Sequence, residues 1–169
     1  ASDVYKRQGM GEMVLAACEM RDEGKDAASI AQAMQDLIGR VNVSFVIDTL
    51  EYMWKGGRCT GVTAFGANLL NLKPCIEMRN GKLEVCKKYR GNIEKVYEKY
   101  IAERLQGKKV DPRYIFITTS NAPTPELAAR LESAVRKAVP EAQEIFFTRT
   151  GCTVTSHCGP GTCLLYTSP

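Results

Sequence analysis

The sequence predicts an α/β domain in which a mixed β-sheet is flanked by helices. Two leading helices are followed by segments in the order β-α-α-ββ-α-β-α-β-β, and such alternation is typical of α/β folds. The Asn80-Gly81 turn requires antiparallel pairing of its two strands, whereas the helical connections later in the chain allow parallel pairing. A composition of 44% hydrophobic and 25% charged residues over 169 positions fits one ordinary folded domain.

Residues 9–39 are predicted to form two helices. Gly24 is suited to end the first helix, and Asp26 is suited to cap the second. In both segments the apolar residues recur at helical spacing. They are Met13, Leu15, Ala16 and Met20 in the first, and Ile30, Ala33, Met34, Leu37 and Ile38 in the second.

The next segment predicts a strand, a short helix and a second short helix. The β-branched and aromatic run from Val41 to Asp48 is typical of a strand. Thr49 is expected to cap a helix that continues through Trp54 and ends at Gly56-Gly57. Residues 62–72 indicate another helix.

Asn80-Gly81 predicts a β-hairpin, because both positions of a tight hairpin turn favour positive φ angles. Four cross-strand pairs follow from folding the chain about this turn: Met78–Leu83 and Ile76–Val85 on one face, and Glu77–Glu84 and Cys75–Cys86 on the other. We expect the first face to cover a core and the acidic face to meet water. A Cys75–Cys86 disulfide is conceivable from this register but is not expected in a reducing compartment.

The second half predicts two amphipathic helices and three strands. Asn92 starts a helix that ends at Gly107, and Thr124 with Pro125 caps and opens another. The helical apolar positions, expected to be core, are Ile93, Val96, Tyr97, Tyr100, Ile101 and Leu105, then Leu127, Leu131, Ala134, Val135 and Ala138. Strands are expected at Tyr114–Thr118 and Ile145–Thr148, and a last one around Val154.

Charge and hydropathy exclude several classes of function. The net charge is only +4 and the 23 basic residues are scattered, whereas a nucleic-acid-binding protein gathers them in a stripe. The apolar runs are too short to cross a bilayer, and no signal peptide is expected after Lys6 and Arg7. We therefore expect a cytoplasmic protein whose seven cysteines are mostly reduced.

Two residues are candidates for binding an anionic group. His157 precedes a Gly159-Pro160-Gly161 turn, where the two glycines leave backbone N–H groups open to a ligand. The alternative is a histidine that hydrogen-bonds only its own turn. Arg58 follows Gly56-Gly57 and could hold an acidic group bidentately, although a solvated loop arginine is the default interpretation.

Other chemistries fit these residues less well. Cys152, Cys158 and Cys163 with His157 lack any CxxC pair, so no zinc or other metal site is expected. Cys158 adjoins His157, but neighbours on a strand point to opposite faces, which disfavours a Cys–His nucleophile. The sequence holds no Walker, GxGxxG or GxSxG motif. The residues alone thus indicate an anion-binding α/β domain and no catalytic residue.

Three motifs resemble the DegV family of bacterial fatty-acid-binding proteins. They are SFVIDTLEYMWKGGR at 44–58, GANLLNLKP at 66–74 with the Asn80-Gly81-Lys82 hairpin, and HCGPGT at 157–162. The resemblance covers roughly residues 9–163 and implies a two-domain α/β fold with a long acyl chain buried between and within the domains.

The resemblance also implies a function and a set of site residues. It implies a non-enzymatic carrier without a cofactor, from which a separate ATP-dependent fatty acid kinase subunit phosphorylates the bound carboxylate to an acyl phosphate for phospholipid synthesis. The polar site residues would be Arg58, His157, Gly159, Gly161 and Thr162. The candidates for the wall around the acyl chain are Phe65, Leu69, Leu70, Ile76 and Met78, and a fatty-acid site needs such an apolar slot with a few polar groups.

In relatives, the resemblance implies, an N-terminal domain supplies hydroxyl groups to the carboxylate. We expect this chain to be a truncated fragment that lacks that domain. We expect residues 9–39 to be helices leading from that domain and residues 40–163 to be the C-terminal α/β domain. Residues 1–8 and 164–169 resemble translated adapter sequence and are expected to be non-native tails. Two other functions stay open: an acyl- or phosphoryl-transfer enzyme using His157 or Cys158, and a structural α/β domain that binds nothing.

Overall fold

The structure, a computed structural model, describes residues 2–38, 40–57, 72–79 and 82–168. Helices are α1 (Ser2–Asp22), α2 (Ala27–Ile38), α3 (Glu51–Lys55), α4 (Ile93–Leu105), α5 (Pro125–Ala138) and α6 (Cys152–Cys158). Strands are β1 (Asn42–Val46), β2 (Leu72–Arg79), β3 (Lys82–Arg90), β4 (Tyr114–Thr119), β5 (Glu144–Arg149) and β6 (Cys163–Thr167). They form one sheet in the order β3-β2-β1-β6-β4-β5. The β4–β5 pair is parallel and the other pairs are antiparallel, so the predicted mixed sheet is confirmed.

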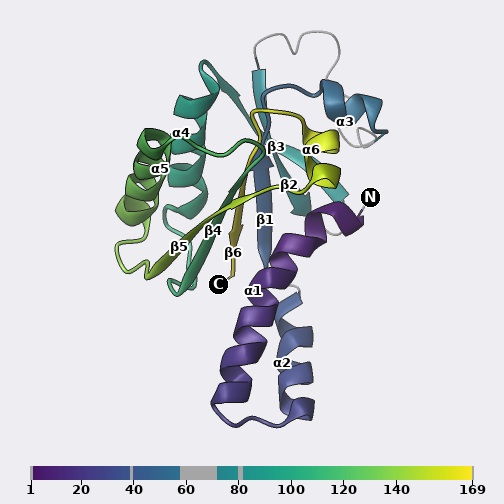
Figure 1. Cartoon of the computed structure of the whole chain (residues 1–169), viewed down its shortest axis with the longest axis vertical. Helices are drawn as coiled ribbons and strands as arrows, with labels where there is room; N and C mark the ends of the chain where they lie inside the picture. Colours follow the sequence, from purple (N-terminus) through teal and green to yellow (C-terminus); the bar gives the residue numbers. More distant parts are fainter. Residues whose placement is uncertain (1, 39, 58–71, 80–81, 169) are drawn as a thin grey trace.

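Helices cover both faces of this sheet (Figure 1). On one face α4 and α5 pack against the sheet and form what we call the α4/α5 core. On the other face α3 and α6 do the same and form the α3/α6 core. The central strand β6 serves both cores, because Leu165 faces the first while Leu164 and Tyr166 face the second. A strand covered on both faces is expected to be apolar throughout, and β6 is buried along its whole length.

The predicted helix starts in the second half are confirmed in atomic detail. The Asn92 side-chain oxygen accepts a hydrogen bond from Glu94 N at 2.9 Å, and Thr124 Oγ1 accepts one from Leu127 N at 3.2 Å. These contacts satisfy backbone N–H groups that the first helical turn leaves unpaired. The cap at Asp26 is also present, since its carboxylate accepts from Ser29 N at 2.9 Å.

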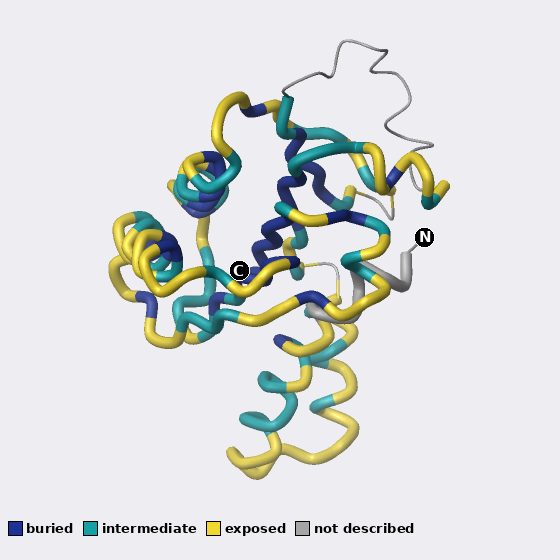
Figure 2. Tube along the Cα trace, turned by 45° about the horizontal axis from the view of Figure 1, so that its top comes forward, coloured by how far each residue is buried: buried dark blue, intermediate teal, exposed yellow. Residues whose placement is uncertain are grey.

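The two leading helices form a hairpin that projects from the α/β body (Figures 1 and 2). The first begins at Ser2 rather than near residue 9. Its contact with the body includes an ion pair between Glu19 and Arg113, with Nη1 2.5 Å from the carboxylate, and a hydrogen bond from the Tyr114 hydroxyl to Glu19. The helix α2 has no buried residue.

In the β2–β3 hairpin, one predicted cross-strand pair is wrong, and so is the predicted exposure of Glu77. Ile76–Val85, Glu77–Glu84 and Met78–Leu83 are paired as expected, but the register then shifts, and Cys75 lies opposite Lys87 instead of Cys86. The expected solvent-facing position of Glu77 is wrong, because this residue is only 7% exposed. The helix α4 covers that face, and its Arg104 forms an ion pair with Glu77 at 2.6 Å.

The predicted strand around Val154 is wrong. This segment forms the helix α6, and the last strand is β6. Its β-branched residues favour a strand, but packing overrides this local propensity: Val154 packs against the α3/α6 core, and Cys158 is fully buried in it.

The remaining expectations concern the tails and the segment 62–72. Leu72 begins β2, and residues 62–71 lie outside the described residues. Residues 164–167 belong to β6, between β1 and β4. The non-native origin of residues 1–8 and 164–169 stays a prediction.

Candidate functional site

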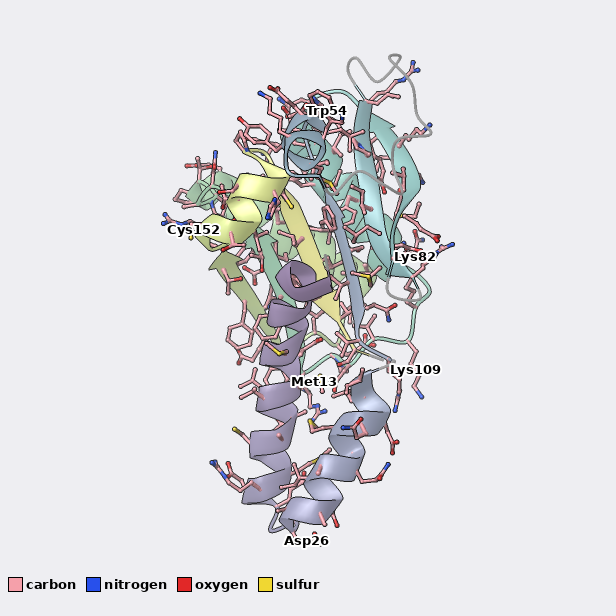
Figure 3. All side chains as sticks on the ribbon, turned by 90° about the vertical axis from the view of Figure 1, so that its right-hand side faces the viewer. Met13, Asp26, Trp54, Lys82, Lys109 and Cys152 are labelled. Carbon is pink, nitrogen blue, oxygen red and sulfur yellow. The ribbon has the colours of Figure 1, made fainter. Side chains whose placement is uncertain are left out.

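His157 lies in the last turn of α6, where it meets the C-terminal end of α3. A Cβ atom placed on Gly56 would lie 2.6 Å from the His157 Nδ1 atom, well inside van der Waals contact. Only glycine therefore allows the backbone after α3 to pass so close to the imidazole. Figure 3 looks onto this side of the molecule, where Trp54 marks α3 and Cys152 marks the start of α6.

This contact joins two of the motifs that carried the family resemblance. Lys55, Gly56 and Gly57 precede Arg58, the last residue of the first motif, and His157 begins the last motif about 100 residues later in the sequence. Arg58 follows Gly57 directly and lies outside the described residues.

The glycines of the following turn adopt positive φ angles, +80° at Gly159 and +69° at Gly161. Side chains of the protein itself occupy the space beside them. A Cβ on Gly159 would lie 2.3 Å from the Tyr52 ring, and one on Gly161 would lie 2.8 Å from the Asp48 Cβ. On these sides the close approach to the glycines is made by Tyr52 and Asp48. The predicted opening of their backbone N–H groups to a ligand stays a prediction.

Thr162 braces the turn from within. It is fully buried, and its hydroxyl is within hydrogen-bonding distance of Cys158 O (3.1 Å) and Gly159 O (2.9 Å). Its backbone is tied to Ser120, whose hydroxyl accepts from Thr162 N at 3.1 Å and whose N–H donates to Thr162 O at 3.0 Å. The hydroxyl proton of Thr162 is thus engaged by the protein, and its visible role is to fix the turn on the end of β4.

Sequence reasoning missed an ion pair beside this turn. Lys73 Nζ lies 2.6 Å from the Asp48 carboxylate and donates to the Asp48 backbone oxygen at 3.2 Å. The Lys73 side chain is only 16% exposed. Both residues belong to the quoted motifs, but they are 25 positions apart in the sequence. The antiparallel pairing of β1 with β2 brings them together, and the sequence alone did not predict that pairing.

Two of the predicted wall residues lie on the face of the sheet that carries His157. Ile76 is fully buried in the α3/α6 core, and Met78 packs against that core while half-buried. The other predicted wall residues, Phe65, Leu69 and Leu70, lie outside the described residues. The described part of the site thus combines an apolar floor with an imidazole at its edge.

The neighbouring cysteines do not form an accessible reactive centre. Cys158 and Cys163 are fully buried, and burial raises the pKa of the Cys163 thiol well above its usual range. Among the residues that the structure describes, no group of three or more metal-ligating side chains gathers. No described helix is both long and apolar enough to cross a membrane.

An open groove between α4 and α5 lies on the other face of the sheet, away from His157. It is lined by Lys99, Arg130 and Lys137 together with Glu98 and small residues. Arg130 is already ion-paired with Glu94 at 2.6 Å. This charged groove lacks the apolar lining of a fatty-acid site.

Known proteins resemble the chain along almost its entire length. Residues 6–168 match the DegV family, described as uncharacterised proteins. A structure of a DegV family protein from Thermus thermophilus, described for its fatty acid binding, is 30% identical with a TM-score of 0.76, covering 95% of this chain and 56% of that one. A fatty acid-binding protein of Thermotoga maritima is 29% identical in an alignment 160 positions long, and the match covers 90% of this chain and 54% of that protein.

A third comparison shows the fold alone. The fatty acid kinase B3 protein of Streptococcus pneumoniae, solved with linoleic acid, is 18% identical with a TM-score of 0.72, covering 92% of this chain and 54% of that one. The chain spans about half the length of the curated relatives that it matches. The family match runs over nearly all of the sequence, and the sheet with its flanking helices has the same fold as about half of each solved relative. The chain therefore belongs to the DegV family.

Proposed function

We propose that the chain is the C-terminal part of a long-chain fatty-acid carrier, and that it presents the bound carboxylate to a separate ATP-dependent kinase subunit that makes the acyl phosphate. Family membership and the fatty-acid-binding relatives at 29% and 30% identity support this function. In this proposal residues 9–39 lead from an N-terminal domain and residues 40–163 form the C-terminal one.

The observation that carries the proposal is the contact between Gly56 and His157 above the α3/α6 core. A fatty acid needs an apolar slot for its tail and a small number of donors for its head. The contact brings the end of the first motif to the imidazole, at the edge of the face that holds Ile76 and Met78. The guanidinium of Arg58 would pair with the carboxylate, and His157 would donate a second hydrogen bond.

The transfer chemistry is assigned to the partner. The Cys158 thiol is buried against the sheet and out of reach of a substrate. Near His157, the Thr162 hydroxyl hydrogen-bonds the backbone of its own turn, and Asp48 and Lys73 are paired with each other. This arrangement suits holding an anion better than attacking one.

The test measures fatty-acid binding by a longer gene product that contains this segment and has the length of the relatives. Arg58→Ala removes a charge-assisted hydrogen bond of about 1.5–3 kcal/mol, so the affinity for a long-chain fatty acid should fall about tenfold to a hundredfold. Acyl-phosphate formation with the kinase should fall in parallel. The matched control is Arg21→Ala, since Arg21 is exposed at the end of α1 and pairs only with Asp22 among the ion pairs described.

Three outcomes separate the functions. Loss of binding in Arg58→Ala with retention in Arg21→Ala supports the carrier. Acyl-phosphate turnover without any kinase subunit would instead identify an enzyme. Absence of fatty-acid binding and of acyl-phosphate formation already in the unsubstituted protein would favour a structural domain, and unchanged binding in Arg58→Ala would refute the role of Arg58.

A further inference from the structure

Cys75 on β2 and Cys86 on β3 lie with their Sγ atoms 3.4 Å apart, and both are present as thiols. The Cys86 thiol also points at the Cys75 backbone oxygen, at 3.5 Å. Cys75 is fully buried, whereas Cys86 is half-buried on the strand at the edge of the sheet. One member of the pair is thus reachable from solvent and the other is shielded.

A β-bulge creates this proximity. The pairing passes from Cys75–Lys87 directly to Ile76–Val85, so Cys86 is the extra residue of β3. The side chains of Cys86 and Lys87 both contact the α4 side of the sheet, through Arg104 and Glu103 respectively. A bulge re-aims a side chain at the cost of one ladder position, and here it points the extra thiol at Cys75.

Charged residues of α4 and β2 surround the pair. Arg104 Nη1 lies 3.9 Å from the Cys86 Sγ, and Arg104 also holds Glu77. The hydrogen bond with Cys75, followed by the charge of Arg104, lowers the pKa of Cys86, while burial and Glu77 oppose this. For Cys75, the contact with Cys86 and burial raise the pKa. The two thiols thus stand in unequal surroundings: Cys86 is half-buried beside the Arg104 guanidinium, which favours its thiolate, whereas Cys75 is fully buried, which favours its neutral thiol.

We propose that Cys75 and Cys86 form a redox-active dithiol that a hydroperoxide oxidises to an intramolecular disulfide across the β2–β3 bulge. Cys86 gives up its proton, its thiolate attacks one oxygen of hydrogen peroxide, and the O–O bond breaks. The leaving hydroxide takes up the released proton and becomes water, and Cys86 becomes a sulfenic acid. The Cys75 sulfur then attacks the Cys86 sulfur, and the thiol proton leaves with the hydroxyl group as water. The pair loses two electrons, the peroxide becomes two waters, and a dithiol reductant restores the thiols by exchange.

The site is independent of the proposed fatty-acid function. The pair faces the α4/α5 core, whereas Ile76 and Met78 face the other side of the sheet. Oxidation can thus be measured on the 169-residue chain itself, without ligand or partner.

The experiment is peptide mapping by mass spectrometry after the chain is treated with hydrogen peroxide, quenched with an alkylating agent, and digested without reduction. The expected product is one cross-linked species that joins Cys75 to Cys86, is two hydrogen atoms lighter than the reduced form, and is reversed by dithiothreitol. In Cys75→Ser the cross-link should be absent, and a sulfenic acid trapped by dimedone should appear at Cys86. Cys152→Ser is the matched control, since Cys152 is exposed on α6, far from the hairpin, and should leave the cross-link unchanged.

Two results would overturn the proposal. In the first, Cys75 and Cys86 are both recovered fully alkylated. They would then have stayed reduced at a peroxide dose that oxidises the exposed Cys152. The other is a cross-link that joins either cysteine to a different partner while the chain stays folded by circular dichroism.

Discussion

Gly56 is the residue on which the geometry of the candidate site depends most directly. It sits where the backbone after α3 passes the imidazole of His157, and no side chain larger than hydrogen fits between them. The sequence predicted a helix end at this position, which is correct. It could not predict the partner, because proximity between residues 56 and 157 arises from the packing of α3 on α6.

Gly56→Ala should disturb the site without unfolding the protein. The new Cβ would lie 2.6 Å from His157 Nδ1 and 3.1 Å from Tyr52 O, so the imidazole or the end of α3 must shift. Overpacking of this kind costs about 1–3 kcal/mol. The free energy of unfolding from urea titration, together with the NMR signals of this one histidine, measures both effects.

Gly11→Ala is the control for this substitution. A Cβ on Gly11 in α1 meets nothing within 4 Å, and alanine favours a helix over glycine. This variant should be as stable as the wild type or more so. Equal stability and unchanged histidine signals in Gly56→Ala would contradict the close packing of α3 on α6.

At the scale of elements, α1 packs against the sheet and buries the carboxyl group of Glu12. Glu12 is only 4% exposed, and burial raises its pKa to about 7, with Ser168 opposing and Asp111 adding to the effect. The folded-state pKa therefore lies above the ordinary value of 4.5. Stability linked to Glu12 is fully present below pH 4.5 and is lost as the pH rises through 7.

The pH dependence of unfolding measures this carboxyl group. A difference of this size corresponds to about 3 kcal/mol between pH 4.5 and pH 8.5. Glu12→Gln should remove that part of the decline and be the more stable protein at pH 8.5. Glu23→Gln, at an exposed position beyond α1, should follow the wild-type curve; parallel curves for all three proteins would show that Glu12 is solvated.

The ion pair between Glu77 and Arg104 links the β2–β3 hairpin to α4. Burial alone would raise the pKa of Glu77, but Arg104 and then Arg79 outweigh it and lower the pKa. Arg104→Met leaves the buried Glu77 carboxylate with only the exposed Arg79 as its ion-pair partner among the pairs described. Losing one partner of a buried pair is strongly destabilising, so this variant should cost about 3 kcal/mol. Replacing both, as Glu77→Leu with Arg104→Met, should recover most of this loss in urea unfolding, and a double variant as unstable as the single one would contradict the account.

The same hairpin shows what sequence patterns can predict for an element. From Asn80-Gly81 in the sequence, three of the four cross-strand pairs were predicted correctly. The length and residues of a hairpin loop determine the strand register close to the turn. No local sequence pattern predicts the β-bulge between Cys75 and Ile76. Nor does any local pattern predict that α4 packs over Glu77. The prediction of a strand around Val154 was wrong for a related reason: Val154 and Cys158 pack in the α3/α6 core, and this tertiary packing overrides the local strand propensity.

For the whole molecule, β6 is the strand on which the sheet depends. It lies between β1 and β4, and its residues enter both cores. The alternating order of helices and strands was sufficient to predict the α/β class, but it placed the last strand too early, around Val154 instead of at Cys163–Thr167. Local patterns do not specify which strand is central, since strand order is a property of the assembled sheet.

Truncation after Thr162 tests the role of β6. Without residues 163–169, β1 and β4 lose their shared neighbour and both cores lose apolar side chains, so cooperative thermal unfolding should disappear. Removal of residues 168–169 alone leaves the strand intact and should preserve the transition. A cooperative transition in the shorter protein, followed by calorimetry, would contradict the strand order.

The most direct test of the central claim is native mass spectrometry of the gene product that carries this segment at the length of its relatives, purified from bacteria under gentle conditions. The account predicts a retained mass in the range of long-chain fatty acids, one molecule per chain, which is displaced by added oleate and lost in a variant carrying both Arg58→Ala and His157→Ala. A wild-type protein that is detected without any bound lipid, and that binds none when oleate is added, would contradict the account.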